Sequence, residues 1–402
     1  MTEITTHDLP RRLRSLPGAA RLLDALEGER NVWVVGGAVR DLLLGRQPVE
    51  LDFVVEGDAV EVARRAARRL SGGPMVHARF GTASIEAPGL RVDLAGARRE
   101  RYARPGALPE VEPGASLTDD LARRDFTVNA IAVRLADGEI AAHPGALEDL
   151  RDGVLRVLHG RSFVDDPTRL LRLARYAARL GFRAEEDTDA LARTAIAGRA
   201  PATVTGPRLG AELRLLAREP QPAAVSELEA RGLGRAVLHP AFTLEQGVTE
   251  RALGLAPEDA RRDLLALASG CLQAPAAELA PRLDVLAFPA SERGTLVASA
   301  TNARALAEAL AGADRPSGMW MLLRREPVES VALAGALGPE ESARRWLEEL
   351  RHVRLAIGGE DLLVAGLEGP AVGRALDAAM AATLDGTAPG RDEQLAAALA
   401  AV

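Results

Sequence analysis

The sequence has no lysine, and all 50 of its basic side chains are arginines. It has one cysteine, Cys271, which excludes an internal disulfide and a cysteine-rich zinc site. No apolar run reaches membrane-spanning length, and the start, MTEITTHDLPRRLRSLPG, has no apolar signal core. These absences predict a cytoplasmic protein with no membrane partner. The missing lysine fits a compositional bias towards arginine and alanine.

Histidine is also scarce, and the six histidines are scattered with no two at the spacing of zinc ligands. The formal net charge of −7 argues against a generally basic nucleic-acid binder. An enzyme can nevertheless carry a local basic strip while the rest of its surface is acidic. At 402 residues, with 47% hydrophobic and 27% charged side chains, the chain predicts a globular protein of roughly two to four domains.

Hydrophobic periodicity divides the chain into an α/β head and an all-α remainder. A short leading helix is expected over 1–30, and short strand-like runs alternate with helical stretches over 31–160. The rest has helical periods, with a neck over 161–220 and a body and tail over 221–402. Within the head, the Pro- and Gly-rich segment 100–116 predicts a flexible loop.

The stretch VWVVGGAVRDLLLGRQPVELDFVVEGD, residues 32–58, reads as a strand, a turn at Gly36 and Gly37, a helix and a second strand. Glycine at such a turn lets the backbone approach a ligand, and the helix N-terminus favours an anion. Arg40 lies about one helical turn after Gly37, where it can reach the same phosphate. The G-x-G-x-x-G fingerprint of a dinucleotide fold is absent, so a triphosphate is the better prediction.

The second strand carries two acidic residues, Glu50 and Asp52, which strand alternation would place on one face. Two such carboxylates repel each other unless a cation lies between them, and oxygen ligands suit Mg²⁺. Asp93, in the run RVDL, is a third candidate. Three carboxylates on neighbouring strands can hold two ions roughly 3.5–4 Å apart for displacement at phosphorus. The alternative is that the pair only solvates an exposed strand.

GGAVRDLLLG followed by an acidic pair resembles motif A of the class II CCA-adding tRNA nucleotidyltransferases and bacterial poly(A) polymerases. The resemblance implies a mixed β-sheet head of the polymerase-beta type, followed by an all-α neck, body and tail. It also implies a two-metal Mg²⁺ site in which Glu50, Asp52 and Asp93 are catalytic. The family has Asp-x-Asp here, and the extra methylene of Glu50, about 1.5 Å of reach, leaves weak activity or a preference for Mn²⁺ open.

RRDFTVNAI, residues 123–131, resembles motif B of the same family. The resemblance implies that Arg124 and Asp125 contact the ribose of the incoming nucleotide and that Asn129 supports the site. A 2′-hydroxyl both donates and accepts hydrogen bonds, so a charged pair can recognise it. The alternative is a helix start capped by Asp125 before an apolar strand.

The stretch SFVDDPTRLLRLARYAARLGF begins with Asp166 followed by proline, a pattern that is typical of a capped helix start. It resembles the nucleotide-recognition motif of the family, which implies that Asp166 and Arg169 contact the base. Cytosine and adenine offer an amine to a carboxylate, whereas uracil does not. Arg172 and Arg175 would serve the triphosphate. The alternative for the arginines is a solvated helix face.

Together the resemblance implies a tRNA nucleotidyltransferase that adds C and A to the tRNA 3′ end from CTP and ATP and releases pyrophosphate. Its partners would be the tRNA acceptor arm, CTP and ATP. Poly(A) addition and partial CC- or A-addition remain open, because the base-recognition pair is compatible with all of them. A non-catalytic RNA-binding relative is a further alternative, suggested by Glu50. The oligomeric state stays open.

Overall fold

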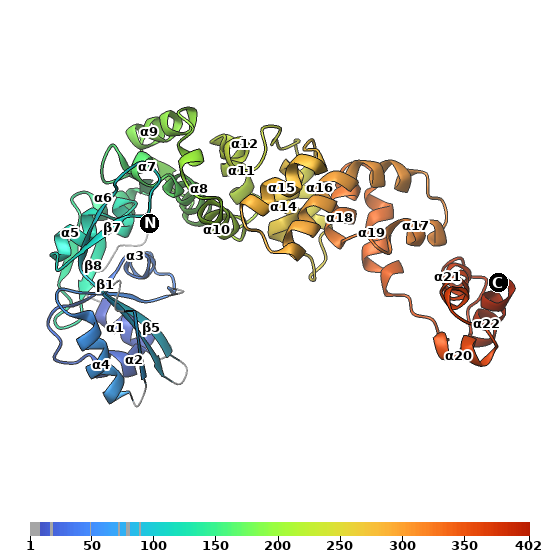
Figure 1. The fold of residues 1–402 in the computed structure, drawn as a ribbon, viewed down its shortest axis with the longest axis horizontal. Coiled ribbons are helices and arrows are strands. Elements are labelled where there is room, and N and C mark those ends of the chain that lie inside the picture. The colour runs from blue at the N-terminus through green and yellow to red at the C-terminus, as the bar shows by residue number, and fades with distance from the viewer. Residues whose placement is uncertain (1–8, 17–18, 49, 71–72, 78–80, 88–89) are drawn as a thin grey trace. The chain divides into compact units, whose positions relative to one another are not determined.

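The computed structural model divides the chain into two compact units, Met1–Thr205 and Gly206–Val402, and each is described by itself (Figure 1). The neck predicted over 161–220 spans the boundary between these units, so the four-part division stays a prediction. The residues that the structure describes are 9–16, 19–48, 50–70, 73–77, 81–87 and 90–402.

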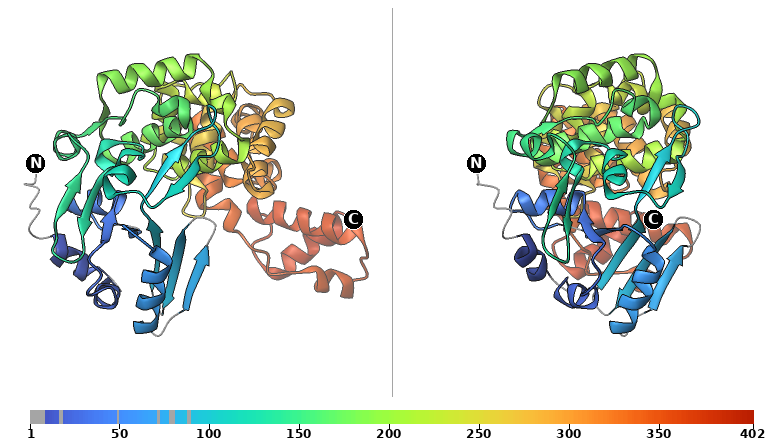
Figure 2. Two further views of the ribbon diagram at one scale, coloured as in Figure 1. Left: turned by 60° about the vertical axis from the view of Figure 1, so that its left-hand side comes forward. Right: turned by 90° about the vertical axis from the view of Figure 1, so that its left-hand side faces the viewer.

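The first unit is built on a seven-stranded mixed sheet with the order β3-β4-β5-β2-β1-β8-β9. β2 and β5 are paired in parallel, and the other neighbours are antiparallel. Strands β3, β4 and β5 lie side by side in the turned views of Figure 2. The strand bounds are β1 (Val32–Val35), β2 (Asp52–Val55), β3 (Gly73–His77), β4 (Thr82–Ala87), β5 (Leu90–Gly96), β8 (Ile131–Arg134) and β9 (Ile140–Ala142).

Helices and two small sheets surround this sheet. α4 packs against β3, β4 and β5 through a face rich in buried alanines. The helices are α1 (Leu9–Ser15), α2 (Ala19–Ala25), α3 (Gly37–Leu43), α4 (Ala59–Arg69), α5 (Leu117–Ala122), α6 (Ala146–Asp152), α7 (Ser162–Asp165), α8 (Thr168–Leu180) and α9 (Glu186–Ala197), with 3-10 turns η3 (Thr127–Asn129) and η4 (Ala200–Thr203). The small sheets pair β6 (Arg98–Arg101) with β7 (Glu110–Pro113) and β10 (Val154–Leu155) with β11 (Arg183–Ala184).

The face of the sheet that carries Val54 packs against α5. Trp33, Val35 and Val54 form one buried cluster with Leu117 and Leu121 of that helix. Because side chains alternate along a strand, Asp52 lies on the same face as Val54, at the end of the strand. The apolar cluster therefore supports the sheet directly beside Asp52.

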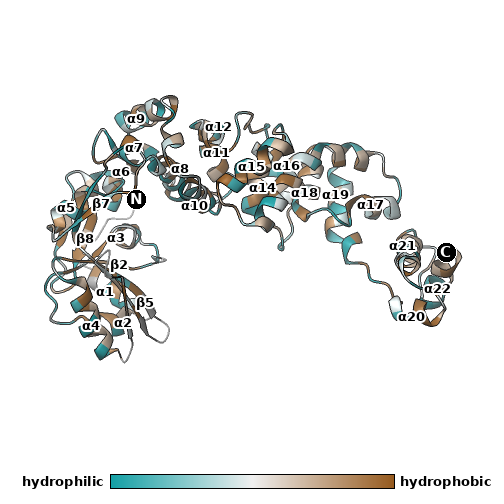
Figure 3. Ribbon diagram, in the orientation of Figure 1, coloured by the Kyte–Doolittle hydropathy of each residue, from teal (hydrophilic) through white to brown (hydrophobic). Residues whose placement is uncertain are grey.

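The second unit is helical throughout its described length, as predicted, and polar and apolar residues alternate along its helices (Figure 3). Gly210 allows α10 to approach the end of α15, because a Cβ there would lie 1.8 Å from the carbonyl oxygen of Leu286. The helices are α10 (Gly206–Ala217), α11 (Ala223–Ala230), α12 (Leu233–Val237), α13 (Val248–Leu255), α14 (Arg262–Gly270), α15 (Ala276–Val285), α16 (Ala290–Ala311), α17 (Pro316–Leu323), α18 (Val328–Ala336), α19 (Glu340–Glu348), η5 (Leu350–His352), α20 (Gly359–Val364), α21 (Pro370–Leu384) and α22 (Arg391–Ala400).

The structure corrects two details of the sequence prediction. The leading segment contains two short helices, α1 and α2, in place of one, and residues 1–8 and 17–18 of it lie outside the described residues. The segment 100–116 is not wholly a loop, because β6 and β7 pair as an antiparallel hairpin. Among the described residues, no helix combines the length and apolar character that crossing a membrane requires.

Candidate functional site

The acidic residues of the site belong to a row that crosses four strands. Asp93 is the register partner of Ser84 on β4 and of Asp52 on β2, and Asp52 is the partner of Val35 on β1. Register partners on neighbouring strands point to the same face of a sheet. These four residues line a cavity of about 400 Å³, whose wall also includes Arg98, Arg123 and Arg124.

The electrostatics of this row favour a cation. Burial raises the pKa of Asp52; the charge of Arg124 opposes this effect, while the charges of Glu50 and Asp93 add to it. The Ser84 hydroxyl donates to Asp93 Oδ1 at 2.5 Å and orients that carboxylate. A divalent cation between the two carboxylates would relieve their repulsion.

Glu50 lies two residues before Asp52, where β2 begins, and both residues are exposed. The shared face predicted for their two carboxylates stays a prediction. Across the part of the chain that the structure describes, no three or more His, Cys, Asp or Glu side chains are gathered to hold a metal ion. Asp52 and Asp93 lie together, and the assignment of Glu50, Asp52 and Asp93 as catalytic metal ligands stays a prediction.

The predicted turn after β1 is present, and its first glycine makes room for a basic side chain. Gly36 has φ 71°, a conformation that favours glycine, and its N–H donates to the carbonyl of Ile131 at 3.0 Å. A Cβ on Gly36 would lie 2.7 Å from Arg124 Nη1. Gly37 then starts α3. The turn therefore brings motif A and the second arginine of motif B into contact.

Two acidic residues, one buried and one partly buried, hold the motif B arginines in place. Asp120, which is fully buried, accepts from Arg124 Nη2 at 2.9 Å and from Arg123 Nε at 2.9 Å. Glu100 on β6 accepts from Arg123 Nη1 at 2.7 Å and from Arg98 Nη2 at 3.2 Å. Sequence analysis did not identify this set of residues. Arg123 adjoins Arg124 in the motif, but only the folded hairpin reveals the other partners.

Asp125 is buried, and both of its carboxylate oxygens accept hydrogen bonds from neighbouring protein groups. Its Oδ1 accepts from the Asn129 amide at 3.0 Å and from the Phe126 backbone N–H at 2.8 Å. Its Oδ2 accepts from Arg172 Nε at 2.7 Å and Nη2 at 2.5 Å. Burial would raise the pKa of Asp125, but the charge of Arg172 and the hydrogen bonds from Asn129 and Arg172 lower it to about 2.

Arg40 is 1% exposed and extends from α3 into the interior of the unit. Its Nη1 donates to Asn129 Oδ1 at 2.6 Å, and its Nε donates to Asp41 Oδ1 at 2.8 Å. The guanidinium carbon lies 5.1 Å from the centroid of the Tyr176 ring. In this structure Arg40 thus connects motif A to motif B and to α8, and its predicted phosphate contact stays a prediction.

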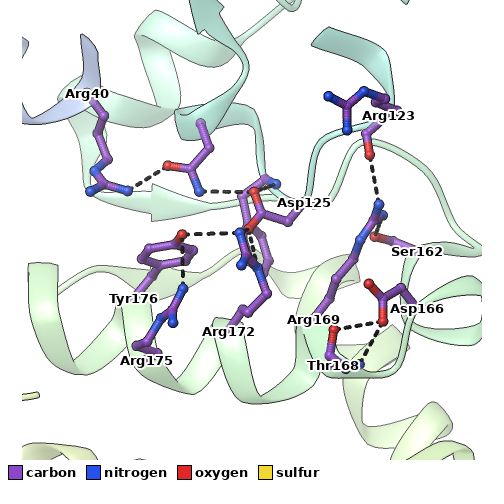
Figure 4. Close-up of polar contacts among 12 residues, drawn as sticks. Arg40, Arg123, Asp125, Ser162, Asp166, Thr168, Arg169, Arg172, Arg175 and Tyr176 are labelled. Carbon is purple, nitrogen blue, oxygen red and sulfur yellow. Dashed lines mark hydrogen bonds and ion pairs between the residues drawn. The ribbon is translucent and has the colours of Figure 1, made fainter. Parts of the chain in front are cut away.

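The pair predicted to recognise the base, Asp166 and Arg169, lies at the start of α8 (Figure 4). Asp166 Oδ1 accepts from the Thr168 backbone N–H at 3.2 Å and from its hydroxyl at 2.7 Å, while Pro167 occupies the N-cap position of α8. Arg169, which is 4% exposed, donates to the Ser162 hydroxyl at 2.6 Å and to the Arg123 carbonyl at 2.8 Å. Contact of Asp166 and Arg169 with a base stays a prediction.

Two arginines further along α8, Arg172 and Arg175, lie against Tyr176, whereas Arg179 is exposed. Arg175 is 8% exposed, and its Nη2 lies 3.4 Å from the Tyr176 hydroxyl oxygen. Arg172 Nη2 lies 3.3 Å from the same oxygen. The interpretation as a solvated face is therefore wrong for Arg175, and the contact of Arg172 and Arg175 with the triphosphate stays a prediction.

Comparison with known proteins agrees with these motifs. The Poly A polymerase head domain family matches residues 32–156. The CC-adding tRNA nucleotidyltransferase of Deinococcus radiodurans is 36% identical, over 85% of this chain and 82% of that protein. The Thermotoga maritima CCA-adding enzyme complexed with tRNA_CCA has a TM-score of 0.77 at 30% identity, covering 94% of each chain.

The A-adding relatives match only in part. The A-adding tRNA nucleotidyltransferase of Aquifex aeolicus is 49% identical over 41% of this chain. The chain spans between 20% and 51% of the length of the three A-adding relatives that it matches. The match to the Deinococcus protein, in contrast, covers most of both chains. On that match, the motifs and the fold, the chain belongs to the class II tRNA nucleotidyltransferase family, which shares the poly(A) polymerase head domain.

Proposed function

We propose that this protein is a cytoplasmic tRNA nucleotidyltransferase that adds C and A to the tRNA 3′ end from CTP and ATP and releases pyrophosphate. The observation that carries the proposal is the Asp52–Asp93 pair, which borders a cavity together with the motif B arginines. Acidic oxygens beside guanidinium groups suit a metal-bound triphosphate, because carboxylates bind the cation and arginines bind the phosphates.

The donor set at the row fits a hard divalent cation. Asp52 and Asp93 offer carboxylate oxygens, and burial together with acidic neighbours raises the pKa of Asp52, so bound positive charge would favour its ionised form. Mg²⁺ matches such ligands, and Mn²⁺ is the alternative because Glu50 has a longer side chain than the family's Asp. When bound, the cation would stabilise negative charge on phosphoryl oxygens.

The protein's own residues would position the nucleotide by charge and hydrogen bonding. Arg124, next to Gly36, and the ionised Asp125 would contact the ribose. Asp166 and Arg169 would contact the base edge. The phosphate-binding set would be Gly36, Gly37, Arg40, Arg172 and Arg175.

The helical second unit would bind the tRNA acceptor arm through phosphate contacts and shape. The Thermotoga neighbour, which has a similar fold over most of its length, is complexed with tRNA_CCA. Arginine is the only strongly basic side chain available for such contacts, and it donates to phosphate in a bidentate manner. Binding should therefore weaken steeply with added salt.

The test is the extension of a tRNA transcript that lacks its 3′ CCA, with Mg²⁺ and CTP, ATP or both. Three added nucleotides that require both substrates would establish the proposed activity. Two nucleotides from CTP alone would identify a CC-adding enzyme, and a single A on a transcript ending in CC would identify an A-adding enzyme. A long tail from ATP would identify a poly(A) polymerase. No extension with Mg²⁺ or Mn²⁺, while tRNA still binds, would leave an RNA-binding relative.

A further inference from the structure

Five side chains from α3, motif B and α8 form a closed ring of contacts (Figure 4). The Tyr176 hydroxyl lies within hydrogen-bond distance of Arg172, and Arg172 makes two hydrogen bonds to Asp125. Asp125 accepts from Asn129, which in turn accepts from Arg40. The Arg40 guanidinium closes the ring by lying over the Tyr176 aromatic face.

Tyr176 lies among three guanidinium groups, those of Arg40 and Arg172 within the ring and that of Arg175 beside it. The guanidinium carbons of Arg40, Arg172 and Arg175 lie 5.1, 5.7 and 5.2 Å from its ring centroid. Like charges repel strongly away from water. An aromatic face attracts cations, and the hydroxyl oxygen accepts from Arg172 and Arg175. Tyr176 therefore offsets the repulsion among the three guanidinium groups. Without Tyr176, a bound triphosphate would have to supply that compensation.

A third contact joins Tyr176 to motif B. Its ring meets the ring of Phe126 edge to face, with centroids 5.9 Å apart and an interplanar angle of 87°. Phe126 directly follows Asp125 in the sequence, and its backbone N–H donates to the Asp125 carboxylate. Tyr176 thus acts on Asp125 by three routes: through Arg172, through Arg40 with Asn129, and through Phe126.

We infer that Tyr176 is a positioning residue for ribose recognition, which holds the Asp125 carboxylate in the orientation that distinguishes a ribonucleotide from a deoxyribonucleotide. The inference rests on the proposed function only in taking Asp125 as a ribose contact. Tyr176 is 7% exposed, so it acts through its neighbours and offers little surface to a ligand. Substitution of Tyr176 should therefore change the selectivity between ribonucleotides and deoxyribonucleotides and should largely preserve the fold.

The experiment measures dissociation constants for CTP and dCTP, with Mg²⁺, on the full-length wild type and two variants. Tyr176→Phe keeps the ring and removes the hydroxyl, and should lower the preference for CTP over dCTP by about three- to tenfold. Tyr176→Leu removes the ring as well and should lower it further, by about tenfold or more. The kcat/KM ratio for the two nucleotides in tRNA extension should follow the same order.

Leu22→Ala is the matched control, because Leu22 is fully buried in α2 and is not part of the ring. It should lower thermal stability and leave the CTP/dCTP ratio unchanged. An unchanged ratio in both Tyr176 variants, or a wild type with no preference for CTP, would overturn the inference. A wild type that prefers CTP but does not extend tRNA would refute the proposed function alone, and the binding ratios would still decide the role of Tyr176.

Discussion

Asp52 on β2 and Asp93 on β5 are register partners in parallel strands, and Ser84 on β4 donates a 2.5 Å hydrogen bond to Asp93. If the two carboxylates hold the catalytic cation, Asp52→Asn and Asp93→Asn should each lower kcat by about a hundredfold or more. Ser84→Ala removes only an orienting hydrogen bond and should cost about two- to tenfold. Steady-state tRNA extension measures the rates, and circular dichroism verifies folding. Full activity in either Asp variant would refute the assignment.

Glu50 precedes β2 and still raises the pKa of Asp52 through its charge, so its carboxylate acts at the site from an exposed position. Glu50→Asp shortens the side chain by about 1.5 Å and should change the ratio of activity in Mg²⁺ to activity in Mn²⁺, because Mg²⁺ demands the stricter geometry. Glu50→Gln, which removes the charge, should lower activity with both ions. Metal ratios that are identical in the wild type and both variants would exclude Glu50 from the metal site.

Gly36 has a positive φ and leaves room for Arg124, whose Nη1 would be 2.7 Å from a Cβ at this position. Gly36→Ala should therefore strain the turn and displace the guanidinium, with an expected loss in kcat/KM of about tenfold or more. Gly45→Ala is the control: its φ is also positive, but nothing lies within 4 Å of the added methyl group. It should lower stability while nucleotide binding is retained. Equal effects of the two variants on binding would show that strain alone is responsible.

The ionised Asp125 should stabilise the first unit in a pH-dependent manner. Its folded pKa of about 2 is below the ordinary value, so its contribution is fully present above about pH 4 and is lost as the pH falls towards about 2. Asp125→Asn should cost about 2 kcal/mol or more at pH 7, because it leaves Arg172 without its carboxylate. Urea unfolding at pH 7 and between pH 4 and 2.5 measures the difference, which should shrink with acid. A constant difference would contradict the lowered pKa.

The sequence by itself determined the family, the division into an α/β head and a helical remainder, and the turn at Gly36 and Gly37. These features depend on local periodicity and on motifs that are contiguous in the chain. The hydrogen bonds between Asp166 and Thr168 belong to the same class, because they join residues two apart in the chain and need no distant partner.

The tertiary structure alone decided which charged residues meet. The strand pairing that places Ser84 and Asp93 beside Asp52, and the hairpin that brings Glu100 to Arg123, join segments that no local pattern connects. The arginines of α8 illustrate the same limit: helical spacing alone suggested a solvated face, whereas packing buries Arg175 against Tyr176. Burial and long-range hydrogen bonds depend on the whole fold, so they become visible only when the chain is folded.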